Sequence, residues 1–222
     1  MWDKWTQYFI KLIAPAIWAT LRMVSVTMCL SFLLGFLLAC LMILTHPVRG
    51  LRPNRYIYQP ISVAVNMIRS LPFIILVVTI APITRYLLGS MVGEAAAVLP
   101  MTVGGVPFLA RILENAMLEV DQGLVDAARS FGASDTQILF RVLLVEAVPS
   151  IINNTTLASI NCVGSTTMAG AVGAGGLGAV ALNYGFYSFN DMVLYTCVVI
   201  TLIFVQLIQV IGYKLYKSSL RS

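Results

Sequence analysis

The sequence contains few charged residues. Asp, Glu, Lys and Arg make up 10% of its 222 residues, whereas they make up about 25% of a typical soluble domain. Hydrophobic residues account for 59% of the chain, and the mean hydropathy is +0.90. This composition excludes an ordinary soluble domain. It predicts an all-α integral membrane protein, because helices satisfy their own backbone hydrogen bonds in lipid.

The signatures of several function classes are also missing. No GxxxxGK[ST] phosphate loop occurs, so the chain is not expected to hydrolyse ATP by that chemistry. The single histidine, His46, has no ligand set around it, and the four cysteines form no CxxC pair. The spans lack a nucleophile with a base, paired aspartates or a metal cluster, as an intramembrane protease or lipid transferase would need. We therefore expect no catalytic residue, no metal site and no bound cofactor.

Long uncharged stretches predict about five transmembrane helices, since a helix needs roughly 20 residues to cross the hydrocarbon core. The expected spans are 18–44, 61–80, 92–111, 149–168 and 192–213. The chain then divides into an interfacial segment at 1–17, three spans within 18–112, a polar insert at 113–148, and two spans within 149–222 that are joined by a glycine-rich connection and followed by a basic C-terminus. Trp2, Lys4 and Trp5 are typical of a membrane interface.

Basic residues distinguish the two possible orientations. With the N-terminus outside, nine would lie on the inner side: Arg49, Arg52, Arg55, Arg111, Arg129, Arg141, Lys214, Lys217 and Arg221. Three would lie outside: Lys4, Lys11 and Arg85. The positive-inside rule favours N-out and C-in, which places the insert in the cytoplasm. The small net charge of +5 fits this orientation signal better than nucleic-acid binding.

The insert has the pattern of a helical hairpin between Glu119 and Glu146. Apolar residues recur at helical spacing through its first half, which predicts a surface helix with one apolar stripe. Gly132 is suited to the left-handed conformation that often ends a helix. Ser134 followed by Gln137 is a capping-box pattern and predicts the start of a second helix.

The hairpin is also acidic. From Glu114 to Glu146 the chain carries six acidic residues and two arginines. One interpretation is a solvated amphipathic hairpin, whose polar face needs no partner. The other is a negatively charged projection that docks on a cytoplasmic partner with a basic groove.

The spacing within the hairpin resembles the EAA motif of ABC importer permeases. Asp126, Ala127 and Ala128 are followed after three residues by Gly132, and after nine more by Val142 and Leu144. Two positions depart from the motif. Asp126 replaces its glutamate with a shorter carboxylate, and Val145 replaces its proline, so the turn after this helix is expected further on, at Pro149. The resemblance implies that these residues couple the chain to an ATP-hydrolysing subunit.

The resemblance extends over nearly the whole chain to methionine-type importer permeases. It is carried by NMIRSLPFIILVV, LPMTVGGVPFLARILENAMLEV and TTMAGAVGAGGLG, which begin at Asn66, Leu99 and Thr166. It implies the type I importer permease fold in a bacterial inner membrane. Two copies would work with two ATPase subunits, which bind ATP and Mg, and with a lipid-anchored substrate-binding protein outside. The implied cargo is methionine, L and possibly D. Another small amino acid or peptide, or a stand-alone channel or carrier, remains an alternative.

Polar residues within the spans are candidates for the translocation pathway. Arg69 is the one arginine well inside a predicted span, where a charge is costly and suggests function. Snorkelling to the interface, or a span that starts later than Arg69, is the alternative for this side chain. Asn66, one turn earlier, and Asn161 with Ser165 would continue a polar track. Met168 is a candidate gate, although thioether side chains are more often core packing.

The tract Gly173–Gly178 matches GxGxxG in form. A dinucleotide site would need a preceding strand and a soluble βαβ unit, and here a membrane helix precedes the tract. We expect small residues here to let helix backbones approach closely, or to form a bend that lines the pathway.

Overall fold

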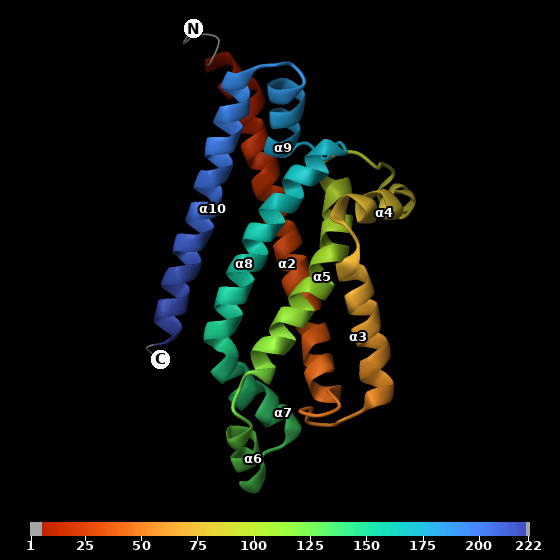
Figure 1. Ribbon diagram of the computed structural model, residues 1–222, viewed down its shortest axis with the longest axis vertical. Helices are drawn as coiled ribbons and strands as arrows, with labels where there is room; N and C mark the ends of the chain where they lie inside the picture. Colours follow the sequence, from red (N-terminus) through yellow and green to blue (C-terminus); the bar gives the residue numbers. More distant parts are fainter. Residues whose placement is uncertain (1–5, 221–222) are drawn as a thin grey trace.

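The computed structural model describes residues 6–220, and this part of the chain is helical without any strand. The all-α fold is therefore confirmed. The helices form an elongated bundle with the N-terminus at one end and the 119–146 hairpin at the other (Figure 1). The elements are α2 (Ala14–Thr45), α3 (Arg55–Ser70), α4 (Phe73–Leu88), α5 (Glu94–Leu118), α6 (Gln122–Ser130), α7 (Asp135–Ile138), α8 (Leu144–Ala171), α9 (Gly176–Val180) and α10 (Asp191–Ser219), with π-helical segments at Phe9–Ile13, Leu139–Leu143 and Ala181–Phe186.

The first helix is longer than expected. It runs without a break from Thr6 to Thr45, so the described part of the expected interfacial segment at 1–17 continues into the first span. Forty residues rise about 60 Å, twice the hydrocarbon thickness. Trp2, Lys4, Trp5 and Arg221 lie outside the described residues.

Fewer helices than five meet the length and composition of a membrane span. Within residues 6–220 these are Thr6–Thr45, Glu94–Leu118 and Asp191–Ser219, with the α3–α4 pair as a possible fourth. The remaining candidate, α8, has 28 residues, which is long enough to cross a bilayer at about 1.5 Å per residue. Its asparagines and hydroxyl residues, Asn153, Asn154 and Asn161 among them, reduce its hydropathy. They indicate that part of α8 faces water or protein rather than lipid.

The expected span at 61–80 is not one continuous helix. The structure divides it between α3 and α4, whose axes are bent by 108°. The break lies at Leu71 and Pro72, which have extended backbone angles (ψ 131° and 134°). A residue before proline is disfavoured in the helical region, and proline cannot donate to the preceding turn. The sequence therefore contained the local signal for this break.

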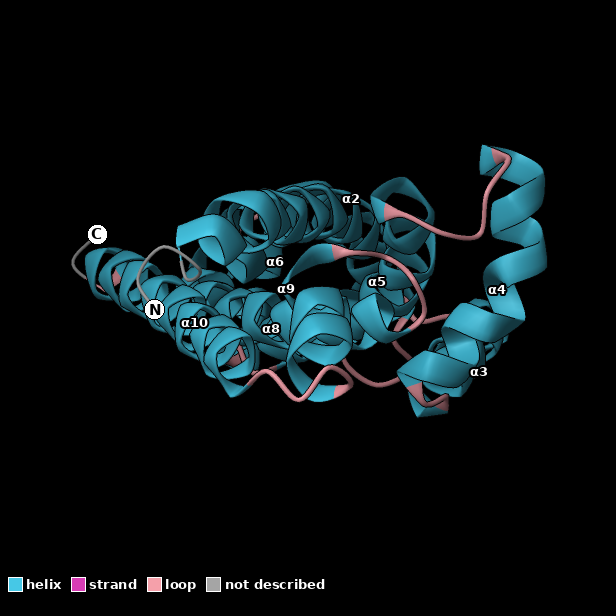
Figure 2. Ribbon diagram, turned by 90° about the horizontal axis from the view of Figure 1, so that it is seen from above, coloured by secondary structure: helices cyan, strands magenta, loops and turns pink. Residues whose placement is uncertain are grey.

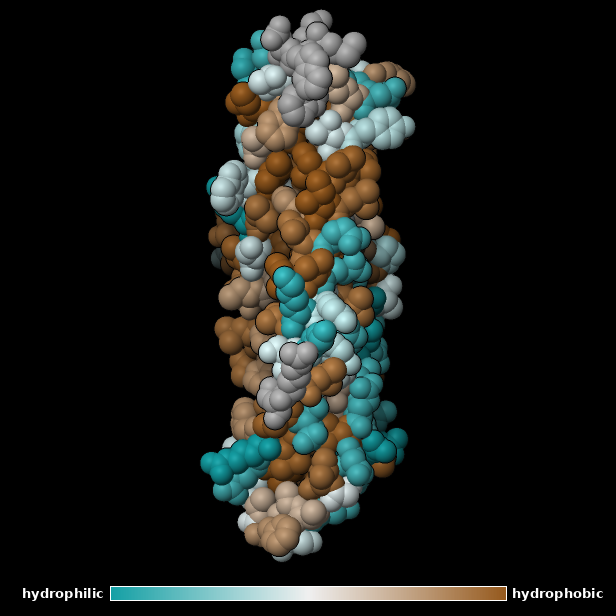
Figure 3. Space-filling view, turned by 90° about the vertical axis from the view of Figure 1, so that its left-hand side faces the viewer, coloured by the Kyte–Doolittle hydropathy of each residue, from teal (hydrophilic) through white to brown (hydrophobic). Residues whose placement is uncertain are grey.

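The long helices α2, α5 and α8 occupy the middle of the bundle, with α3 and α4 on one side and α10 on the other (Figure 2). The face beyond α10 is largely apolar over the upper half of the molecule (Figure 3). The exposed side chains of α10 include Leu202, Ile203, Leu207 and Ile211. Such a surface is stable in contact with lipid or another apolar chain, which agrees with a membrane protein.

The glycine-rich tract lets two helices meet backbone to backbone. A Cβ on Gly178 of α9 would lie 2.5 Å from the Cα of Thr167 in α8, and one on Gly170 would lie 2.5 Å from the backbone nitrogen of Ala179. No side chain fits at either distance. The expectation of close backbone approach is confirmed.

We expect Gly178→Ala to destabilise the protein by about 1–3 kcal/mol, because its added methyl group overpacks the contact with Thr167. Gly164→Ala is the matched control, since a Cβ at this position in α8 meets nothing within 4 Å. Alanine there should be neutral or stabilise the helix by up to about 1 kcal/mol. Thermal unfolding of the purified variants in detergent measures both effects. Equal unfolding temperatures for the two variants would contradict the close contact.

Candidate coupling and transport sites

The hairpin begins as the sequence predicts. Asp121 caps α6, and its carboxylate accepts a hydrogen bond from the backbone N–H of Gly123 at 3.0 Å. Gly132 has a φ of 80°, in the left-handed region. The Ser134 side chain accepts from the Gln137 backbone N–H, while the Gln137 side chain accepts from the Ser134 backbone N–H. The helix, the glycine turn and the capping box are confirmed.

The second helix of the hairpin is not a separate short helix. It continues from Asp135 through the π-helical segment at Leu139–Leu143 into α8. Pro149 lies inside α8, so the turn expected there is absent. One proline removes one helical hydrogen bond. Leu143 and Ala147 pack in the core. Their burial stabilises the helical turn that precedes Pro149.

The motif residues differ in their access to solvent. Asp126, Ala127 and Gly132 are exposed, and Ala128 is half-buried. Val142 and Leu144, in the helix that leads to α8, are also half-buried. The most prominent apolar side chain at the tip is Phe131, which is 92% exposed. The exposed surface of the hairpin therefore includes a carboxylate, small residues and one large apolar side chain.

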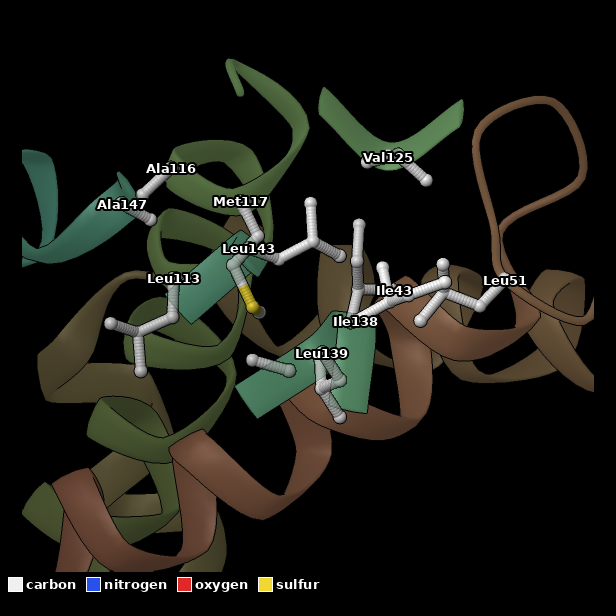
Figure 4. Packing of buried hydrophobic residues seen from close by; sticks show 11 residues of the cluster. Ile43, Leu51, Leu113, Ala116, Met117, Val125, Ile138, Leu139, Leu143 and Ala147 are labelled. Atoms are coloured by element: carbon white, nitrogen blue, oxygen red, sulfur yellow. The ribbon is translucent and has the colours of Figure 1, made fainter. Parts of the chain in front are cut away.

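The inner face of the hairpin is fixed to the bundle by a buried apolar core (Figure 4). Its buried members come from α2, the α2–α3 loop, α5, α6, α7, the π-helical segment at Leu139–Leu143 and the start of α8: Ala39, Ile43, Leu51, Leu113, Ala116, Met117, Val125, Ile138, Leu139, Leu143 and Ala147. Val125 is the one buried residue of α6. A displacement of α6 must therefore move the core that α2, α5 and α8 share, because close-packed side chains transmit strain.

Glu114 does not belong to the solvated insert, contrary to the sequence-based expectation. Helix α5 continues to Leu118, and Glu114 is 0% exposed within it. Its Oε2 accepts a hydrogen bond from Arg111 Nη1 at 2.7 Å. Its Oε1 is buried and has no hydrogen-bond partner. The expected insert at 113–148 thus begins after Leu118.

Arg111 joins α5 to α3. Its Nη2 donates to Ser62 Oγ at 2.7 Å and to Asn66 Oδ1 at 3.2 Å, and its Nη1 donates to Tyr58 Oη at 3.2 Å. The three acceptors are spaced four residues apart and so follow one face of α3. Asn66, a predicted pathway residue, is thus bonded to Arg111. The arrangement is an ion pair in which Glu114 is buried and the half-buried Arg111 cross-links two helices.

The other predicted pathway residues meet at one cavity. A cavity of about 600 Å³ lies between α2, α3, α4, α5 and α8, and its lining includes Arg69, Asn161, Ser165 and Met168. Asn66 is not part of that lining. The guanidinium of Arg69 lies over the Phe108 ring at 5.9 Å from its centroid, within reach of a cation–π interaction. The structure thus brings four polar or polarisable side chains from two distant segments to one open space.

Two lining residues escaped the sequence analysis. Thr27 and Ser31 of α2 line the cavity, and their buried hydroxyl oxygens have no hydrogen-bond partner within residues 6–220. Together with Thr20 they recur at helical spacing on one face of α2, a signal that was present in the sequence. Unpartnered buried hydroxyls indicate space for water or a polar ligand.

Comparison with known proteins shows that the sequence matches transport permeases. The family described as binding-protein-dependent transport system inner membrane component matches residues 31–221. The probable D-methionine transport system permease protein MetI of Vibrio cholerae is 40% identical over 214 residues, which cover 96% of this chain and 95% of that protein. The methionine import system permease protein MetP of Bacillus subtilis is 41% identical over 159 residues, or 72% of each chain.

Solved structures of ABC transporters also match this chain. A crystal structure of the MetNI methionine ABC transporter in an inward-facing conformation contains a chain that matches with a TM-score of 0.91 and 40% identity, covering 95% of this chain and 97% of that chain. A crystal structure of an amino acid ABC transporter with histidines shares the fold at a TM-score of 0.73 and 19% identity. The resemblance to ABC importer permeases is confirmed. The chain belongs to the family of binding-protein-dependent transport system inner membrane components.

Proposed function

We propose that this chain is the membrane-spanning permease of an ATP-driven importer whose cargo is methionine. The observation that carries the proposal is the match to the MetNI methionine transporter at 40% identity over 95% of the chain. Named relatives from Vibrio cholerae and Bacillus subtilis, both methionine permeases, support the same cargo. ATP and Mg would bind to a separate ATPase subunit, since the sequence has no phosphate loop.

The assembly we propose contains two copies of this chain and two ATPase subunits in a bacterial inner membrane. A lipid-anchored substrate-binding protein would deliver cargo at the outer side. The N-terminus would lie outside and the hairpin in the cytoplasm, because the sequence then assigns nine basic residues to the inner side and three to the outer side. The N-terminus and the hairpin at opposite ends of the bundle are compatible with this orientation (Figure 1).

Coupling follows from the two faces of the hairpin. Asp126, Ala127 and Gly132 on the exposed face would seat against the ATPase, whereas Val125 anchors the other face in the shared core. Ala128, Val142 and Leu144 are half-buried between the two. Closure of the ATPase subunits would displace α6 and with it the ends of α2, α5 and α8. The bundle would then alternate between inward- and outward-facing packings.

The pathway in this proposal is the 600 Å³ cavity. Arg69 would contact the cargo's carboxylate, Asn161 and Ser165 would supply polar contacts, and Met168 would narrow the opening. Asn66 would act one turn away, at the Arg111 cross-link.

Arg69→Met is expected to lower the rate of uptake by about tenfold, because a charge-assisted hydrogen bond contributes about 1.5–3 kcal/mol. The measurement is uptake of radiolabelled methionine by proteoliposomes that contain the whole complex. Arg85→Met is the matched control, since Arg85 lies in the last turn of α4 and does not line the cavity. Full uptake by Arg69→Met would remove Arg69 from the pathway.

The decisive test of the function is reconstitution. The permease with its ATPase and binding protein should take up methionine only with ATP, and methionine with its binding protein should stimulate ATP hydrolysis. The permease alone should transport nothing. Nucleotide-independent flux through the chain alone would instead identify a channel or carrier. Uptake of another small amino acid or a peptide in preference to methionine would correct the cargo and leave the permease function intact.

A further inference from the structure

The loop between α2 and α3, residues 46–54, is a fixed structure, and we call it the clasp. Two backbone hydrogen bonds tie it to the end of α2, from Arg52 to Leu44 at 2.8 Å and from Asn54 to Thr45 at 3.0 Å, and a third, from Gly50 to His46 at 3.0 Å, lies within the loop. The His46 ring nitrogen Nδ1 also accepts from the backbone N–H groups of Val48 and Arg49. A Cβ on Gly50 would overlap the backbone of His46. The clasp is therefore a compact turn rather than a flexible linker.

The clasp contacts the hairpin through one ion pair, one hydrogen bond and one apolar side chain. Arg52 Nε lies 2.6 Å from Asp135 Oδ2, in the first turn of α7. Arg129 of α6 donates to the carbonyl oxygen of Leu51 at 3.0 Å. The Leu51 side chain, 6% exposed, belongs to the same buried core as Val125 and Ile138 (Figure 4).

A further contact ties the clasp to the end of α5. Arg49 Nη1 donates to the carbonyl oxygen of Leu118 at 2.6 Å. Leu118 is the last residue of α5, where helix carbonyls lack intrahelical donors and the helix dipole favours a cation. The clasp thus contacts the segments on both sides of α6.

The clasp leads directly into α3. The Asn54 side chain caps this helix by accepting hydrogen bonds from the backbone N–H groups of Tyr56 and Ile57. Sixteen residues later α3 ends beside the cavity, where Arg69 lies just before the break at Leu71 and Pro72. Helix α3 is continuous over its 16 residues, about 24 Å, although Pro60 inside it removes one helical hydrogen bond. Displacement of the clasp would be passed along this helix toward the cavity wall.

We infer that the clasp is a second coupling element, through which displacement of the hairpin is passed to α3 and so to Arg69. This inference rests on the proposed function, because it requires an ATPase that moves α6. Arg52 and Arg129 are positioning residues in it, with Leu51 as the apolar anchor. The arginines of the clasp then have a mechanical role in addition to any role as a positive-inside signal.

The test compares two arginines that lie three residues apart. Arg52→Glu places two carboxylates together at Asp135, whereas Arg55→Glu makes the same charge change at a side chain whose contact is with Gln59 of its own helix. Both variants are studied as the reconstituted importer, and the readout is ATP hydrolysed per methionine transported. We expect Arg52→Glu to raise this ratio about threefold. Arg55→Glu should leave it unchanged, and both should co-purify with the ATPase.

A charge swap and a distance measurement complete the test. Arg52→Glu/Asp135→Arg should return the ratio toward that of the unmodified chain. In a chain whose cysteines are replaced by alanine, spin labels at Tyr56 and Thr136, both exposed, should keep one distance with and without trapped ATP. A second pair at Thr136 and Tyr213 reports the hairpin's movement. An unchanged ratio in Arg52→Glu, or a Tyr56–Thr136 distance that changes with nucleotide, overturns the inference. Failure of the unmodified complex to transport would overturn the proposed function instead.

Discussion

Arg111→Met is expected to lower the free energy of unfolding by about 3–5 kcal/mol, which is the usual cost of leaving a buried charge without its partner. Glu114 is 0% exposed, and one of its oxygens already lacks a hydrogen-bond partner. Removing the Arg111 guanidinium would leave both carboxylate oxygens of Glu114 buried without a hydrogen-bond partner. It would also break the cross-link to Ser62 and Asn66 on α3.

The double variant separates charge burial from helix cross-linking. Arg111→Met/Glu114→Met removes both charges with side chains of similar volume, and such replacements are often neutral or stabilising. We expect it to recover most of the loss, apart from about 1 kcal/mol for each bond that no longer joins α3 to α5. Unfolding in detergent, followed by circular dichroism, gives the comparison.

Arg69→Met controls for the loss of an arginine as such. Arg69 is exposed at the cavity, and no ion pair is found for it within residues 6–220. Its replacement should change the stability by less than about 1 kcal/mol. If Arg111→Met were as stable as the unmodified chain, Glu114 would not be a buried carboxylate in the folded protein.

Features set by neighbouring residues could be predicted from the sequence. The capping box at Ser134 and Gln137 depends on residues three apart, and the left-handed turn at Gly132 depends on one residue. Both are present. The break before Pro72 has an equally local cause, which was overlooked because the apolar run continues through it. An X–Pro pair inside a predicted span is therefore a reason to expect two helices.

Features set by contacts between distant segments could not be predicted in the same way. Glu114 was assigned to a solvated acidic surface, yet it is buried because Arg111, one turn earlier, neutralises it. That arginine was a usable signal at helical spacing. The clasp had no such signal, because Arg52 and Asp135 are 83 positions apart in the sequence and are brought together only by the bundle. Its arginines therefore suggested only membrane orientation.

Gly132→Trp is expected to abolish co-purification of the ATPase while leaving membrane insertion intact. Gly132 lies in the exposed turn between α6 and α7, and its Cβ direction is open, with nothing within 4 Å. An indole there would project from the exposed surface of the hairpin, to which Asp126 and Ala127 also belong. A seated interface leaves no room for it, since interface cores pack as densely as protein interiors.

The left-handed conformation of Gly132 provides a matched control. Any side chain at a φ of 80° costs about 1–2 kcal/mol, so strain alone would weaken the turn. Gly89 ends α4 with a φ of 75° and is equally open, and α4 lies far from α6 (Figure 1). Gly89→Trp therefore carries the same strain without touching the hairpin, and it should retain the ATPase. Because the two variants differ only in location, loss of the ATPase in Gly132→Trp alone assigns docking to this face. Retention in both would place the ATPase contact elsewhere.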